Sequence, residues 1–396
     1  MTLRRLQYSK IEQVNFKPRS DIAFIILKSF RYINSRFFNE LIIVKIKYTL
    51  PISFLFWCAI TIAAPTSDWK KIVRDTPYSF SKGASKNLAE LRRWVLLSNG
   101  YCEFPNRHVF FDQRGRFLTW MDNEDSSEAT QAKLNKIRLQ LHQNNKVNRW
   151  IEGSASRIGY PFALSCDQPW VDIGASIDRV KGIAPQSKVW GTWDGVKAGT
   201  KSKPISLEAL VELMFQHRSS QLVKPIETLS LRLFVAQLII ESGAKKHVRS
   251  SDNALGMLQL KPEVLNDCGI DKRYYQHRMA QVDCAVRLYV MISRNLQPAF
   301  SSVFGHLEKA KQQALFDILL VQSYHSGIGA MTKLLTDNEM GKAARYFAEY
   351  EQQFSAEDIA TGMIFHNLGR QPWGWESLYY VLDIMIVSKS LSAHDS

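Results

Sequence analysis

Residues 226–240 form a nearly continuous apolar run, and this run constrains the fold more than any other feature of the 396-residue chain. The run is apolar on nearly every face when it is placed on a helix, which is typical of a helix buried in a core. Glu241 follows directly, and Gly243 is a natural point for the helix to stop. The run therefore predicts a buried helix with a carboxyl group at its end. Burial and the negative end of the helix dipole both disfavour the ionised form of that group.

The residues after Glu241 continue a longer pattern. Ser242 follows at once, and Met257-Leu258 lies within the later half of the pattern. The other matching positions come at fixed offsets from Glu241 and are Ala254, Gly256, Gln259 and Pro262. This order resembles the Glu-Ser and Gly-Leu-Met-Gln signatures of lytic transglycosylases with a soluble-lytic-transglycosylase (goose-lysozyme-like) domain, which cleave peptidoglycan. The inverted Met-Leu order is a roughly volume-conserving exchange.

Two later segments resemble the remaining signatures of that family. Ser323-Tyr-His-Ser-Gly327 is similar to its Ala-Tyr-Asn-Ala-Gly motif, and Glu376-Ser-Leu-Tyr-Tyr-Val381 is similar to its Glu-Thr-x-x-Tyr-Val motif. All four signatures occur in the order of the family, and the resemblance covers about residues 225–385. His325 replaces the usual Asn, so the role of its side chain is open, because His has a different reach and can titrate.

The resemblance implies cleavage of the β-1,4 bond between N-acetylmuramic acid and N-acetylglucosamine without water. Glu241 would protonate the glycosidic oxygen and then, as a carboxylate, take the proton from the C6 hydroxyl of the muramic acid, which closes a 1,6-anhydro ring. Asp252, the nearest candidate for a second carboxylate, is expected to be a turn residue. The residues implied to contact the substrate or to orient Glu241 are Ser242, Gly256, Gln259, Tyr324, His325 and Tyr380.

Two alternatives stay open beside this interpretation. One is a hydrolytic muramidase or chitinase of the same fold, and the other is an inactive cell-wall-binding or scaffold protein. We expect glycan strands of peptidoglycan as the main partner, possible wall or membrane proteins as further partners, and no nucleic acid. No catalytic metal or other cofactor is expected, since the histidines are scattered without HExxH or related spacing.

Residues 48–64 have the composition of a secretory signal, with lysines before an uncharged apolar core and small residues at its end. The core is shorter than the ~20 apolar residues of a spanning helix and contains Pro51. We therefore expect cleavage near Ala63 or Ala64 and a periplasmic or exported protein, with an inner-membrane anchor formed by residues 48–64 as the alternative. The long basic region before the core suggests that translation begins near Val44.

The net charge of +14 divides evenly between the leader and the rest of the chain. Residues 1–48 hold ten Lys and Arg against three Asp and Glu, a net of +7, which leaves 14 − 7 = +7 for the remainder. That remainder suits a protein that meets an anionic polymer, and it equally suits a solvated basic surface. Charge alone does not favour nucleic acid over cell wall.

Four cysteines remain after the leader, an even number in a chain that is expected to reach an oxidising compartment. We predict the pairs Cys268–Cys284 and Cys102–Cys166, because each pair then stays within one predicted domain. Buried free thiols are the alternative.

The predicted fold class is α+β, with a leader (1–64), a smaller mixed α/β accessory domain of unknown role (65–200) and a mainly α, lysozyme-like catalytic domain (201–396). A linker at Gly199–Pro204 marks the boundary. The predicted accessory elements are helices at 87–97 and 129–150 and a hairpin at 108–120. The predicted catalytic helices are 207–216, 226–240, 278–296, 308–325, 339–352, 356–367 and 375–388.

Local signals support several of these elements. Ser206 is expected to cap the helix that begins at Leu207, and Pro262 to begin another helix. Ser355 and Asp358 resemble a capping box. Four tryptophans of the accessory domain are candidates for stacking on sugar rings, although core positions are the more ordinary interpretation: Trp150, Trp170, Trp190 and Trp193.

Overall fold

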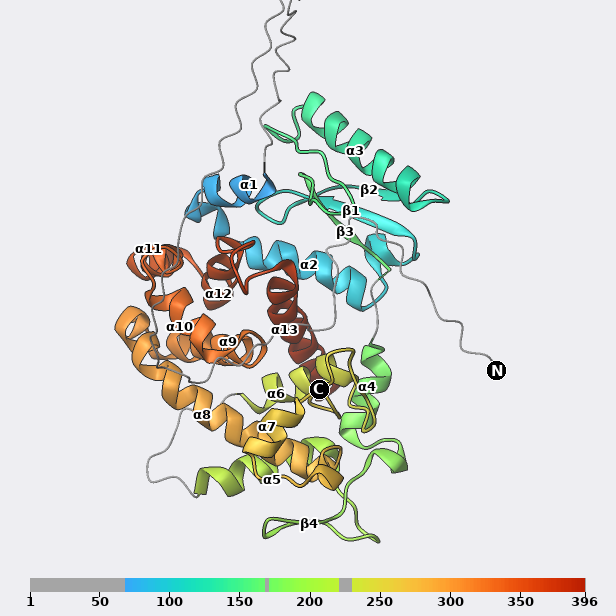
Figure 1. The fold of residues 1–396 in the computed structure, drawn as a ribbon, viewed down its shortest axis with the longest axis vertical. Coiled ribbons are helices and arrows are strands. Elements are labelled where there is room, and N and C mark those ends of the chain that lie inside the picture. The colour runs from blue at the N-terminus through green and yellow to red at the C-terminus, as the bar shows by residue number, and fades with distance from the viewer. Residues whose placement is uncertain (1–67, 168–170, 221–229, 396) are drawn as a thin grey trace, which may run out of the picture. The chain divides into compact units, whose positions relative to one another are not determined.

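Helices α6 (Leu231–Ser242) and α13 (Trp375–Asp395) pack against each other, and the candidate site lies at their contact. The computed structural model describes residues 68–167, 171–220 and 230–395, all within one compact unit (Figure 1). The predicted leader lies outside these residues, as do Trp170 and the first residues of the 226–240 run. Within the described part of the chain, no helix is both long and apolar enough to cross a membrane.

The first part of the described chain contains a three-stranded antiparallel sheet in the order β2-β1-β3. Strands β1 (Arg107–Phe111) and β2 (Phe117–Asp122) form the predicted hairpin, and Gly115 takes a φ of +69° in its turn. Strand β3 (Phe162–Ser165) pairs with the other edge of β1. The remaining elements of this part are α1 (Trp69–Asp75), η1 (Tyr78–Ser81), α2 (Ala84–Leu96), η2 (Gly100–Cys102), α3 (Ser127–Gln143), α4 (Ile173–Lys181), η3 (Pro185–Ser187), β4 (Gly191–Trp193) and β5 (Val196–Ala198).

Helix α3 is shorter than the predicted 129–150 helix. Ser126 caps its start by accepting a hydrogen bond from the Ala129 N–H. The helix ends before Asn144, and Asn145 takes a φ of +55°, in the left-handed region that asparagine tolerates better than most residues. The prediction was wrong for the last seven residues because it did not treat the Asn pair as a helix stop.

The second part is mainly helical, and the α+β, mainly helical class is confirmed. The predicted helices are present with shifted ends, and α10 was not predicted. Pro262 is the first residue of α7, as expected. Apart from α6 and α13, the elements are α5 (Leu207–Ser220), α7 (Pro262–Asp267), η4 (Lys272–Tyr274), α8 (Arg278–Phe304), α9 (Lys309–Ser326), α10 (Ile328–Thr336), α11 (Lys342–Glu349), η5 (Glu351–Gln353) and α12 (Ala356–Phe365).

Helix α8 continues eight residues beyond the predicted end at residue 296. Pro298 lies inside the helix, where it removes one backbone donor. Phe300 and Phe304 are fully buried beyond it, and their rings contact each other. Burial of two aromatic side chains therefore outweighs the local cost of the proline.

Two serines cap helices at the predicted positions. Ser206 Oγ accepts a hydrogen bond from the Ala209 N–H, and Ser355 Oγ accepts one from the Asp358 N–H. The capping box is only half formed, however. The Asp358 carboxylate accepts hydrogen bonds from the Gly83 and Ser85 N–H groups and from Ser85 Oγ. Asp358 thus caps the start of α2, a tertiary contact that local spacing does not predict.

The two predicted domains share a packed contact. Helix α2 packs on α12 and α13, and Arg92 of α2 forms a fully buried ion pair with Asp383 of α13, at 2.7 Å. The predicted linker is a tight turn in which the N–H groups of Thr200 and Lys203 each donate to the other residue's carbonyl. The boundary at residue 200 stays a prediction.

Both predicted disulfides are confirmed. Cys102 is bonded to Cys166, and Cys268 is bonded to Cys284. The first pair joins η2 to the residue after β3, and the second joins the end of α7 to α8. Each bond therefore closes a loop inside one of the two parts.

Candidate active site

Glu241 is the penultimate residue of α6. The residues before it, from Phe234 to Ile240, are all buried, so they hold the end of the helix firmly in the core. Gly243 ends the helix in the left-handed conformation, with a φ of +65°, and its N–H donates to the Ile239 carbonyl. Glu241 itself is partly exposed.

Tyr380 connects the last sequence signature to the first. Its hydroxyl donates a hydrogen bond to Glu241 Oε1 at 2.7 Å, across 139 residues of sequence. The Tyr380 ring stacks on the His325 ring, with centroids 4.3 Å apart and planes 22° apart. The structure therefore brings together three of the predicted site residues, from α6, α13 and α9.

Residues 254–260 form a loop beside Glu241 that two predicted site residues hold in place. Ser242, the neighbour of Glu241, donates from its hydroxyl to the Met257 carbonyl at 2.7 Å. Tyr324 is buried and donates to the next carbonyl, that of Leu258, at 2.8 Å. Both side chains therefore connect this loop to helices that carry other site residues.

Gly256 and Gln259 shape the same loop. Gly256 has a φ of +71°, and a Cβ atom there would lie 2.6 Å from the amide of Gln281. Gln259 is buried, and its amide donates to the Gly256 carbonyl at 2.8 Å and to the Val248 carbonyl at 3.4 Å. The close approach that requires glycine at position 256 is thus the approach of the Gln281 side chain. A role of either residue in substrate binding stays a prediction.

Gln281 of α8 is a site residue that sequence analysis missed. Its side-chain carbonyl accepts from the Leu258 N–H at 3.1 Å, and its amide donates to the carbonyls of Leu255 and Tyr275. The side chain is fully buried. A signal existed, because Gln281 interrupts the apolar helical stretch 279–286, and a buried amide is retained where it is hydrogen-bonded.

Gln237 and Tyr289 form a second missed pair behind the site. Gln237 lies one turn before Glu241 on α6, fully buried, and its carbonyl accepts a hydrogen bond from the Tyr289 hydroxyl. The Tyr289 ring stacks on Tyr324, with planes 16° apart. The Gln237 amide nitrogen has no hydrogen-bond partner among the described residues. The sequence signal for this pair was Gln237 itself, a polar amide within the otherwise apolar stretch 234–240.

Two further carboxyl groups lie on segments that carry predicted site residues. Glu376 lies one turn before Tyr380 on α13, and burial raises the pKa of its carboxyl group. Asp252 lies in a turn, as expected, and its Oδ2 atom is buried without a partner among the described residues. Within the described ranges, no group of three or more His, Cys, Asp and Glu side chains is arranged to hold a metal ion, and the metal-free site stays a prediction.

The candidate tryptophans of the first part have different environments. Trp190 is 54% exposed. Trp193 packs against Tyr274 and His277, and its indole N–H donates to Asp283 at 3.2 Å. Trp193 is therefore partly buried and fixed by side-chain contacts, whereas the exposed ring of Trp190 is open to a ligand.

Comparison with known proteins adds no family. The chain matches none of the protein-family models against which it was compared, and no curated protein matches its sequence. The functional interpretation therefore rests on the four sequence signatures and on the contacts of Glu241, Tyr380 and the 254–260 loop.

Proposed function

We propose that this protein is a lytic transglycosylase that cleaves peptidoglycan with Glu241 as its single catalytic acid and base, in a lysozyme-like domain. The observation that carries the proposal is the hydrogen bond from Tyr380 to Glu241 Oε1. It joins the first and last signatures of the family pattern at one carboxyl group. Signatures that matched the family pattern by chance would not be expected to contact each other in the folded chain.

The proposed reaction begins with a proton moving from Glu241 to the glycosidic oxygen as the bond from that oxygen to C1 of the muramic acid breaks. The Glu241 carboxylate then takes the proton of the C6 hydroxyl, and the C6 oxygen forms a new bond to C1. No water enters, and the carboxyl group regains its proton. Tyr380 orients the carboxyl group in both steps, and its hydrogen bond stabilises the carboxylate between them.

The contacts of the loop at 254–260 also support this proposal. Its backbone is held by buried hydrogen bonds to the Met257 carbonyl and to the Leu258 carbonyl and N–H, from the side chains of Ser242, Tyr324 and Gln281 in turn. These bonds define the position of the loop relative to Glu241. Such an arrangement suits a site that has to hold a sugar in a reactive geometry.

An exported protein fits the proposed substrate. The two disulfides support this localisation, because such bonds persist in oxidising compartments such as the bacterial periplasm. Fractionation of cells is the check, and the finding of the protein in the cytoplasm alone would contradict the proposal.

Digestion of purified sacculi tests the activity. The wild type is expected to release soluble muropeptides, and Glu241→Gln to release about 10²–10⁴ times fewer, the usual contribution of general acid–base catalysis. Wild-type protein that releases nothing but still pellets with sacculi would favour the wall-binding role. Digestion that survives in Glu241→Gln would refute the catalytic assignment.

A further inference from the structure

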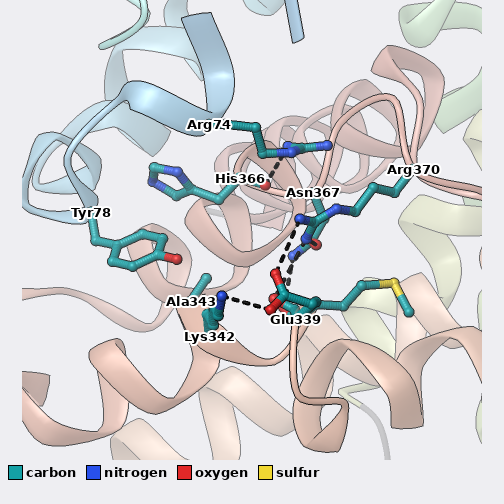
Figure 2. Close-up of a pocket in the computed structure, with 9 residues that line it drawn as sticks. Arg74, Tyr78, Glu339, Lys342, Ala343, His366, Asn367 and Arg370 are labelled. Carbon is teal, nitrogen blue, oxygen red and sulfur yellow. Dashed lines mark hydrogen bonds and ion pairs between the residues drawn. The ribbon is translucent and has the colours of Figure 1, made fainter. Parts of the chain in front are cut away.

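A cavity of about 320 Å³ lies between the first helical segments of the described chain and the segment 339–370 (Figure 2). Arg74 and Tyr78 line it from α1 and η1, and Lys342, His366 and Arg370 line it from the other side. None of the predicted site residues belongs to its lining. We refer to it as the Arg74 cavity.

The charged groups that line this cavity are unbalanced. Arg74, Lys342 and Arg370 contribute three positive charges, and Glu339 contributes one negative charge, a net of 3 − 1 = +2. Glu339 lies 2.7 Å from the Lys342 ammonium and 3.8 Å from the Arg370 guanidinium (Figure 2). This carboxylate therefore compensates Lys342 in part and Arg370 weakly.

Arg74 has no carboxylate at ion-pair distance among the described residues, and Asp68 compensates its charge only as a minor, more distant contribution. Its guanidinium donates to the carbonyls of His366 and Leu368, at 2.5 and 2.6 Å, and no carboxylate of a described residue forms an ion pair with it. Burial and then the nearby charge of Arg370 lower the pKa of Arg74 to about 10, so the group stays protonated at neutral pH. Two like charges thus face one partly enclosed space, an arrangement that an anion between them would stabilise.

The other walls of the cavity suit a ligand with a carbon body. The Tyr78 ring packs edge-on against His366, with centroids 4.6 Å apart, and its hydroxyl points toward the space between the cations (Figure 2). Burial lowers the pKa of His366 to about 3, so this imidazole is neutral and adds no further charge. Ala343 also lines the cavity beside Lys342, but it is only 1% exposed and adds little surface.

We propose that the Arg74 cavity is a binding site for a small organic anion, with Arg74 and Arg370 holding its carboxylate or phosphate group and Tyr78 packing on its carbon body. Guanidinium groups form paired, charge-assisted hydrogen bonds with both kinds of group. The site is separate from Glu241 in its residues, so the proposal does not depend on the proposed activity.

Isothermal titration calorimetry on the full exported chain in low-salt buffer tests this site with two probes, inorganic phosphate and N-acetyl-D-alanine. The variants are Arg370→Gln and, because Arg370 also contacts Asn367, the exposed Lys342→Gln as a second removal of charge. Arg345→Gln is the matched control. Arg345 is exposed on α11, donates to two backbone carbonyls and does not line the cavity, yet its replacement changes the net charge by the same amount.

We expect at least one probe to bind at a single saturable site in the millimolar range or tighter. Arg370→Gln should weaken this binding by about tenfold or more, Lys342→Gln should weaken it as well, and Arg345→Gln should leave it unchanged. The probe that binds more tightly identifies phosphate or carboxylate as the preferred group. The absence of saturable binding by either probe would overturn the proposal, and so would equal weakening by Arg345→Gln.

Discussion

The Glu241 site and the Arg74 cavity are built in opposite ways. At the Glu241 site, the residues come from signature motifs, and most of the polar groups described there are matched by hydrogen bonds, as in the contacts of Tyr380 and Gln281. In the Arg74 cavity, the residues come from segments with no motif, and the positive charges exceed the negative charge. The first arrangement suits a precise reaction geometry, and the second suits the capture of a charged ligand.

Polar groups that are matched by hydrogen bonds and charged groups that lack a counter-charge therefore indicate different kinds of site. A satisfied network such as Ser242, Tyr324 and Gln281 around one loop rigidifies a site. A cluster of positive charges around a cavity, with too few negative charges nearby, can be stabilised by a bound anion.

Tyr380→Phe should lower the rate of sacculus digestion by about tenfold to a hundredfold, because it removes a hydrogen bond to the charged form of Glu241. The rate of muropeptide release measures the loss. Tyr379→Phe is the matched control, since the buried Tyr379 hydroxyl has no hydrogen-bond partner among the described residues. The control should leave the rate unchanged, and equal losses in both variants would mean that the Tyr380 contact has no special role.

Gln281→Leu should destabilise the fold by about 1–3 kcal/mol, because it leaves the Leu258 N–H and the Leu255 carbonyl buried without this partner. Urea unfolding measures the change in the free energy of unfolding. Gln297→Leu is the control on the same helix, where the amide bonds only the exposed Ser301 hydroxyl. If both variants lose the same stability, the loop does not depend on Gln281.

Gly256→Ala should act on the same loop and cost a similar amount of stability, because its φ of +71° disfavours a side chain and the new Cβ would lie 2.6 Å from the Gln281 amide. Thermal unfolding reports the effect. Gly195→Ala is the control, with a φ of +79° but open space around the added atom. Gly256→Ala should lose more stability than this control, and an equal or smaller loss would show that Gln281 moves aside easily.

His366, which lines the Arg74 cavity, makes the stability of the fold depend on pH. Its folded pKa of about 3 lies below the ordinary value of 6.5, so the unfolded chain takes up a proton first as the pH falls. Stability should therefore fall from about pH 6.5 downward, by up to roughly 1.4 kcal/mol per pH unit from this group. Urea unfolding at several pH values should show a shallower slope in His366→Gln than in the wild type. Identical slopes in the two proteins would contradict the assignment.

Sequence analysis predicted those parts of the molecule in which neighbours along the chain decide the outcome. Gly243 and the apolar residues before Glu241 specify a buried helix and its end, and the Ser206 cap follows from local spacing. The disulfides were predictable because only a few pairings exist for four cysteines.

The remaining features depend on tertiary contacts. Asp358 caps α2 from a distant part of the sequence. Helix α8 continues past Pro298 because the side chains of Phe300 and Phe304 are buried in the core. Gln281 matters because of the loop that it meets, which spacing does not reveal. The Arg74 cavity could not be predicted at all, because Arg74 and Arg370 are far apart in the sequence and line one cavity only in the folded chain.

Mass spectrometry of the muropeptides released from purified sacculi tests the central claim most directly. If Glu241 catalyses ring closure onto the C6 oxygen, the new muramic acid ends carry a 1,6-anhydro ring and are lighter by one water than hydrolytic ends. We expect anhydro ends with the wild type and none above background with Glu241→Gln. New ends that contain the elements of water, or anhydro ends that persist in Glu241→Gln, would contradict the account.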